Sequence, residues 1–294
     1  MNRWSRLSMT SLLCCSVACQ PTDEAGFGVG GSGGVGGGGG ATSTNCPAGM
    51  VEVDAVAAAT LGETDPDQLD AHAGNIIPAV TVSVEAFCVA VHPLPGVSGA
   101  AWMQDGLNIG QVEILDGLLP DYGRRLCTVS ELMVAAAGTD NQRYAYGPDY
   151  DASACGTEAF FPSALGSNPG CTSPSGARDF HIRSSWAVLD DAIHDAVEPS
   201  RGDAGIPGDG DYAAYGGTAQ QDTFYAPDNF GIHFYGPEDF SSDIPAYPTD
   251  DVRICGAVGD LDGAVEAEWS DWVGALRDAA TYRDVLGPGL ELNR

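Results

Sequence analysis

The distribution of cysteines constrains this chain more than any other feature of its sequence. Nine cysteines fall into two groups, three within the first 19 residues and six spread over the remainder. The six are Cys46, Cys88, Cys127, Cys155, Cys171 and Cys255. If the chain is exported, this even number predicts three disulfides, although six cysteines allow several connectivities. Bound zinc is the alternative, but the chain has no CxxC motif and no cluster of histidines.

One pairing follows from the local sequence. The segment between Cys155 and Cys171 is loop-like, so we expect these two cysteines to pair. Closing so short a loop stabilises a folded chain by roughly 3 kcal/mol.

The N-terminus has the order of a secretory signal. Arg3 and Arg6 precede the apolar stretch of residues 7–18, and Cys19 follows. Residues 16–19, SVAC, resemble a bacterial lipobox, although such boxes usually have Leu where Ser stands here. We therefore expect residues 1–19 to be a lipoprotein signal peptide and Cys19 to carry a lipid that anchors the protein to a membrane. The expected location is the outer membrane or cell surface of a bacterium; the alternative is an ordinary signal peptide cut nearby.

Composition then separates a tether from a domain and excludes one class of partner. Residues 20–45 are almost all glycine and other small residues, which predicts a flexible linker with an r.m.s. reach of about 25–30 Å. The formal net charge is -29, and all 12 basic residues are arginine. Because a strongly negative protein repels the phosphate backbone of nucleic acids, we expect no nucleic-acid partner.

Ordered structure is expected to begin at residues 46–53, CPAGMVEV. Residues 81–91, TVSVEAFCVAV, alternate at period two and predict one strand whose inward face includes Val82, Val84 and Cys88.

Residues 123–138, GRRLCTVSELMVAAAG, mark the start of a helix. Thr128 and Glu131 have the spacing of a reciprocal capping box, so the helix should begin at Val129 and end at Gly138 after about nine residues.

The remaining chain divides into two parts. Residues 143–263 are rich in Gly, Pro, Asp, Asn and Ser without clear periodicity, which predicts largely irregular structure. Residues 264–286 have apolar positions at helical spacing and predict an amphipathic helix that docks on the domain, with partner binding as the alternative. The ordered motifs of the chain extend across residues 46–256, which we take as one domain, and residues 257–294 are taken as a C-terminal helical extension.

Several short motifs occur in a fixed order within that domain. They are CPAGMVEV at 46–53, GRRLCTVSEL at 123–132 with YAYG at 144–147, CTSPSGARD at 171–179, GGT at 216–218 and VRIC at 252–255. In kind and order they resemble the formylglycine-generating enzyme family, also called sulfatase-modifying factors, whose hallmark is a G-(K/R)-R-L-P-T-E-A-E-W-E helix start followed by a Y-P-W-G turn. The resemblance implies a single α+β domain of the C-type-lectin-like kind, loop-rich and disulfide-stabilised. It also implies that Cys127 and Cys255 lie close together and form a second disulfide.

The same resemblance bears on chemistry. Enzymes of the family oxidise a substrate cysteine with two thiolates that hold copper(I), a soft ion. The resemblance places these thiols at Gln221 and Ala226, neither of which can supply a thiolate. A calcium-binding segment of the family corresponds to residues 182–187, where Arg183 and Trp186 replace the two oxygen ligands. We therefore expect no copper, and we lean away from an enzyme.

Other candidate sites carry weaker patterns. Asp203, Asp209 and Asp211 could hold calcium through hard oxygens, but an acidic solvated loop explains them better. The five histidines show no metal-ligand spacing, and no GxSxG motif supports a Ser-His-Asp hydrolase.

The sequence thus favours an exported, lipid-anchored protein whose domain serves binding or surface architecture, with no cofactor predicted. One alternative is an enzyme of the same fold, such as a metal-dependent oxidase or hydroxylase acting on a protein cysteine or another substrate. The second alternative is a lectin-like module that binds a glycan or peptide in a groove formed by Tyr215, Phe224, Tyr225 and His233, residues that would also suit an ordinary loop-packing core.

Overall fold

Ten short strands and several helices make up the part of the chain that the computed structural model describes. The described residues are 45–64, 77–101, 107, 109–149, 151–155, 164–180, 184–201, 212–216, 231–233, 250–259, 262–279 and 285–286. The fold is mixed α+β with small sheets and three disulfides, which confirms the predicted disulfide-stabilised α+β class. No helix in these ranges is long and apolar enough to cross a membrane.

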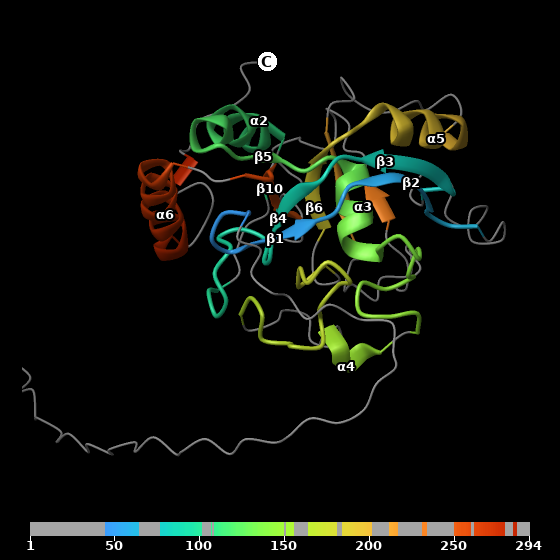
Figure 1. Cartoon of the computed structure of the whole chain (residues 1–294), viewed down its shortest axis with the longest axis horizontal. Helices are drawn as coiled ribbons and strands as arrows, with labels where there is room; N and C mark the ends of the chain where they lie inside the picture. The colour runs from blue at the N-terminus through green and yellow to red at the C-terminus, as the bar shows by residue number, and fades with distance from the viewer. Residues whose placement is uncertain are drawn as a thin grey trace, which may run out of the picture. The chain divides into compact units, whose positions relative to one another are not determined.

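The first sheet joins segments from both ends of the domain. Its order is β1 (Met50–Val53), β4 (Phe87–Ala90), β10 (Ile254–Ala257) and β5 (Arg125–Leu126), with every pair antiparallel (Figure 1). All four residues of β4 are buried. The CPAGMVEV segment, in which the sequence predicts ordered structure, supplies β1.

The prediction of one strand over residues 81–91 is wrong. The chain breaks at Glu85 and Ala86, and β3 (Val80–Val84) pairs with β2 (Val56–Leu61) in a separate two-stranded sheet. The inward direction of Cys88 is confirmed, since its exposure is 0%. Both faces of β4 are covered, so its sequence does not alternate between apolar and polar residues, and no such pattern could have marked the boundary between β3 and β4.

A second four-stranded sheet occupies part of the region predicted to be irregular. Its order is β8 (Gly231–His233), β7 (Tyr212–Gly216), β6 (Ser184–Val188) and β9 (Asp250–Val252), with β6 and β9 parallel. The same region contains the helices α4 (Ala152–Cys155) and α5 (Asp191–Arg201). The prediction of irregular structure is therefore wrong for these elements, because strands of three to five residues are too short to show periodicity.

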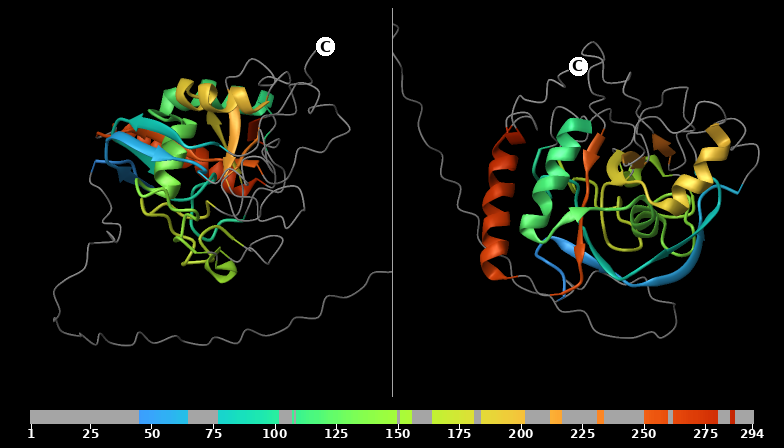
Figure 2. Two further views of the ribbon diagram at one scale, coloured as in Figure 1. Left: turned by 90° about the vertical axis from the view of Figure 1, so that its right-hand side faces the viewer. Right: turned by 90° about the horizontal axis from the view of Figure 1, so that it is seen from above.

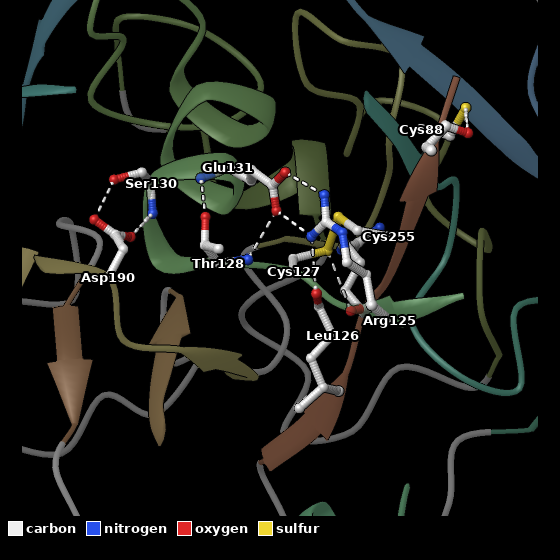
Figure 3. Close-up of polar contacts among 11 residues, drawn as sticks. Cys88, Arg125, Leu126, Cys127, Thr128, Ser130, Glu131, Asp190 and Cys255 are labelled. Carbon is white, nitrogen blue, oxygen red and sulfur yellow. Dashed lines mark hydrogen bonds and ion pairs between the residues drawn. A yellow bond between two sulfur atoms is a disulfide. The ribbon is translucent and has the colours of Figure 1, made fainter. Parts of the chain in front are cut away.

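The predicted capping-box helix is confirmed as α3 (Val129–Ala137). The side chain of Thr128 accepts a hydrogen bond from the amide of Glu131 at 3.2 Å, and the Glu131 carboxylate accepts one from the amide of Thr128 at 2.9 Å (Figure 3). Gly138 follows the helix with φ at 66°, a value that favours glycine. All nine residues of α3 are buried, and the helix packs among β2, β3, β6, β7 and α5.

A docked C-terminal helix is also confirmed, as α6 (Gly263–Asp278), eight residues shorter at its C-terminal end than the predicted pattern. It lies beside α2 (Ile109–Leu118) and the following 3₁₀ helix η1 (Leu119–Tyr122), elements that the sequence analysis did not predict (Figure 2). Leu276 is completely buried, and the ring centres of Trp269 and Tyr122 are 5.6 Å apart.

All six cysteines of the domain form disulfides. Cys127–Cys255 and Cys155–Cys171 are the two pairs expected above, and Cys46–Cys88 is the third. Cys127–Cys255 joins the residue before the α3 cap to β10, across a sequence separation of 128 (Figure 3). Disulfides in this number are typical of extracytoplasmic proteins.

Candidate functional site

A pocket lies between helix α6 and residues 90–98, which comprise the end of β4 and the segment after it. Its volume is about 490 Å³, within the range of small-molecule sites. The walls are mostly apolar and include Met50, Leu94, Pro95, Val97, Ile254, Trp269 and Val273. Polar side chains at the pocket are His92, Ser98, Arg124, Glu266, Ser270 and Arg277.

A partly buried ion pair fixes the α6 side of the pocket. The Arg124 side chain has 0% exposure, and its Nη2 donates to both carboxylate oxygens of Glu266, at 2.9 and 3.1 Å. Its Nη1 donates to the carbonyl of Tyr122 at 2.9 Å, and the guanidinium lies 5.0 Å from the centre of the Trp269 ring. Arg124 therefore holds the first turns of α6 against η1, and its own charge is matched by Glu266.

A buried histidine and a buried aspartate meet at the other side of the pocket. His92 Nδ1 and Asp179 Oδ2 are 2.7 Å apart, and the two residues are 5% and 1% exposed. The same Asp179 oxygen accepts a hydrogen bond from the amide of Gly166 at 3.0 Å. An ionised carboxylate only accepts, so Nδ1 carries the proton and Nε2 of a neutral imidazole is left with its lone pair. Within the described chain, His92 makes no other hydrogen bond.

The side chains of Ser98 and His92 both lie close to the backbone of Gly166. The residues after Ser98 are joined to Leu165 by two backbone hydrogen bonds, from the Gly99 amide to the Leu165 carbonyl and from the Leu165 amide to the Ala100 carbonyl, each 2.9 Å. A Cβ on Gly166 would lie 3.2 Å from His92 Nε2 and 3.0 Å from Ser98 Oγ. The two polar atoms therefore border the same small space, which exists because residue 166 has no side chain.

Arg253 holds the Asp179 segment against the end of β4. Its side chain is completely buried, and Nη1 donates to the carbonyls of Ala90 and Val91 at 2.8 and 3.0 Å. Nη2 donates to the carbonyl of Arg178, and the guanidinium lies 4.0 Å above the Phe180 ring. Burial lowers the pKa of Arg253 to about 10, while the nearby carboxylates act in the opposite direction.

The structure places only some of the sequence-predicted site residues. Several of them lie outside the described residues, namely Cys19, Arg183, Asp203, Asp209, Asp211, Gln221, Phe224, Tyr225 and Ala226. Tyr215 and His233 belong to the paired strands β7 and β8, in neighbouring register positions. Trp186 is a core residue, whose indole N–H donates to the Leu107 carbonyl at 2.9 Å. Within the described ranges, no group of three or more His, Cys, Asp or Glu side chains could hold a metal ion.

Sequence reasoning did not single out His92, Ser98 or the pocket. Asp179 stands at the end of the CTSPSGARD motif, but neither His92 nor Ser98 belongs to any recognised motif. The contact between His92 and Asp179 joins segments that are far apart in the chain, so no spacing pattern could have indicated it.

The fold and the site together define a disulfide-stabilised, extracytoplasmic α+β domain with a mostly apolar pocket. No model of a known protein family matches the sequence, and no curated protein is similar to it at a significant level.

Proposed function

We propose that the protein is an exported, lipid-anchored binding protein whose domain has a fold like that of the formylglycine-generating enzyme family and is used without the copper chemistry. Its binding site is the pocket beside α6, where it holds a small molecule, or a short part of a glycan or peptide. The observation that carries this proposal is the pocket itself, with a volume of about 490 Å³ and a mostly apolar wall.

The construction of the pocket supports a binding role. One wall is held in place by the Arg124–Glu266 pair and by the burial of Leu276. The opposite wall is joined to strand β9 of the second four-stranded sheet, because the Leu94 amide donates to the Val252 carbonyl at 2.8 Å. A preformed site loses little conformational entropy when a ligand binds.

A fluorescence titration with the neutral dye Nile red tests the site. Val97 and Leu118 are both large, exposed apolar residues, 38% and 37% exposed, but only Val97 lines the pocket. Val97→Trp should fill the pocket and weaken dye binding about tenfold or more, whereas Leu118→Trp should leave the affinity unchanged. Glycan and peptide arrays probed with the same variants would then identify the natural ligand class. Equal binding by the two variants would contradict the proposed location.

The cysteines support the absence of copper chemistry. All six cysteines of the domain are in disulfides, so none of them offers the thiolate that copper(I) requires. The test is copper analysis of the purified protein together with incubation of a sulfatase-derived cysteine peptide. We expect neither stoichiometric copper nor aldehyde; finding both would contradict the proposal.

The lipid anchor is tested by partition into Triton X-114. The wild-type protein and Cys15→Ser should enter the detergent phase, because the lipid would be attached at Cys19. Cys19→Ser should move to the aqueous phase. Retention of Cys19→Ser in the detergent phase, or absence of the wild type from it, would contradict lipidation at this residue.

A further inference from the structure

His92 and Ser98 line the pocket from one segment, which follows β4, and Asp179 reaches His92 from a segment that is distant in the sequence. From this arrangement we propose that the pocket is the site of an ester hydrolase, in which Ser98 is the nucleophile, His92 its general base and Asp179 the residue that positions the imidazole. The inference rests on the proposed function to the extent that the same pocket must accept a ligand.

The His92–Asp179 pair has the geometry that general-base catalysis requires. The 2.7 Å contact at Nδ1 holds the ring and fixes the tautomer, so Nε2 is the nitrogen able to take a proton. His92 is only 5% exposed, and its side chain makes no second hydrogen bond among the residues described. An imidazole held in this way can act as a general base towards a group that comes within hydrogen-bond reach of Nε2.

The backbone around Asp179 is held in an unusual conformation. Its φ is 67°, which is uncommon for a residue with a Cβ and is found most often where surrounding structure enforces it, functional sites included. The Asp179 amide donates to the carbonyl of Cys171 at 3.1 Å, and Cys171 is itself held by its disulfide to Cys155. The carboxylate is therefore directed at His92 by a covalently fixed loop.

Ser98 supplies the hydroxyl. It is exposed in the segment that lines the pocket, and the absence of a side chain at Gly166 leaves its Oγ and His92 Nε2 bordering one space. In structures without substrate, catalytic hydrogen bonds are often long and shorten only when substrate binds. A larger residue at position 166 would occupy the space between hydroxyl and imidazole.

The reaction needs no redox partner. Ser98 Oγ attacks the ester carbonyl carbon while His92 Nε2 takes its proton, and collapse of the tetrahedral intermediate breaks the bond to the alcohol, which leaves with that proton. Water then attacks the acyl-serine with the same proton transfers, which releases the carboxylic acid and restores the hydroxyl.

The walls and the charge indicate the substrate class. Leu94, Trp269 and Val273 form an apolar surface suited to an acyl chain. The formal charge of -29 disfavours anionic substrates. The site therefore fits neutral esters with an apolar acyl group.

Labelling with a fluorophosphonate probe, followed by peptide mass spectrometry, tests the nucleophile in the full-length exported protein. Ser153 is the control, because it is also exposed but lies outside the pocket, and its hydroxyl donates to the carboxylate of Asp151. We expect the probe on Ser98, and a kcat/KM for p-nitrophenyl butyrate that falls about 100-fold or more in Ser98→Ala but stays unchanged in Ser153→Ala.

Asp179→Asn tests the positioning residue. Asparagine tolerates the left-handed backbone and can still contact His92, but it favours the wrong imidazole tautomer. We expect kcat to fall about tenfold or more with KM and Nile red affinity unchanged. An unchanged kcat would exclude this role of Asp179.

The outcomes separate the two proposals. If Nile red binds in the pocket but Ser98 is not labelled, or another serine is labelled instead, the hydrolase inference is wrong and the binding proposal stands. If Ser98 is labelled but Val97→Trp does not affect dye binding, the pocket is not the dye site and the proposed binding function fails.

Discussion

Arg253 shows how a single residue can join the parts of this domain that form the site. Its planar guanidinium donates to carbonyls of Ala90, Val91 and Arg178, and so connects the end of β4 to the segment that carries Asp179. Lysine could not replace it, because an ammonium group lacks the fixed fork of donors. Burial lowers the Arg253 pKa to about 10, which still leaves the guanidinium protonated at neutral pH.

Replacing Arg253 by methionine should therefore destabilise the protein strongly. The substitution keeps most of the side-chain volume but removes the cation beside the buried carboxylates of Asp179 and Asp251, a change that typically costs about 3–5 kcal/mol. Urea unfolding followed by tryptophan fluorescence measures the loss. Arg277→Met is the control, since that side chain is 51% exposed and its loss should change stability by about 0.5 kcal/mol or less. Similar values for the two variants would show that Arg253 contributes no special stability.

At the scale of single elements, local signals were sufficient for some parts of the fold and insufficient for others. Helix α3 begins at Val129, as predicted, because its capping box lies within four consecutive residues. The break between β3 and β4 could not be predicted, since it depends on which sheet each half joins. Helix α5 was missed because it lies in a stretch whose composition is typical of loops.

The cap of α3 allows a matched test. Thr128→Ala removes the acceptor of the Glu131 amide and should lower the free energy of unfolding by about 1 kcal/mol. Thr128→Ser keeps a hydroxyl at the same position and should stay close to the wild type. Chemical unfolding of both variants measures the difference, and equal destabilisation would mean that lost methyl packing, not the cap, is responsible.

The docking of α6 can be tested in the same way. Leu276 is a residue of α6 and is completely buried, so Leu276→Ala should weaken the docking of α6 by about 2–5 kcal/mol. Because α6 forms the wall of the pocket, Nile red binding should fall as well. Hydrogen exchange should accelerate in α6 amides but not in β4 amides, whereas Leu118→Ala, at an exposed position of α2, should change neither. Acceleration of both elements would mean that α6 unfolds only together with the sheet.

At the scale of the whole molecule, the cysteine pattern predicted the framework, but the site remained unseen. The even number of cysteines pointed to three disulfides, and the loop-like segment between Cys155 and Cys171 pointed to their pairing. His92 and Asp179 are 87 residues apart, and neither has a neighbour in sequence that indicates the other. They meet because the disulfide-linked loop and Arg253 bring the Asp179 segment to the end of β4, a tertiary result that no local pattern contains.

Two of the disulfides should differ in what they contribute to stability, because they close loops of different length. Cys127–Cys255 spans 128 residues and Cys155–Cys171 spans 16, and all four side chains are at most 1% exposed, so double alanine variants leave comparably buried sites. Loop-closure entropy predicts a loss of about 5 kcal/mol for Cys127→Ala/Cys255→Ala and about 3 kcal/mol for Cys155→Ala/Cys171→Ala. Urea unfolding with the remaining disulfides intact measures both losses. The reverse order would show that the short loop stabilises through native-state contacts, in keeping with its direct link to Asp179, more than through the entropy of the unfolded chain.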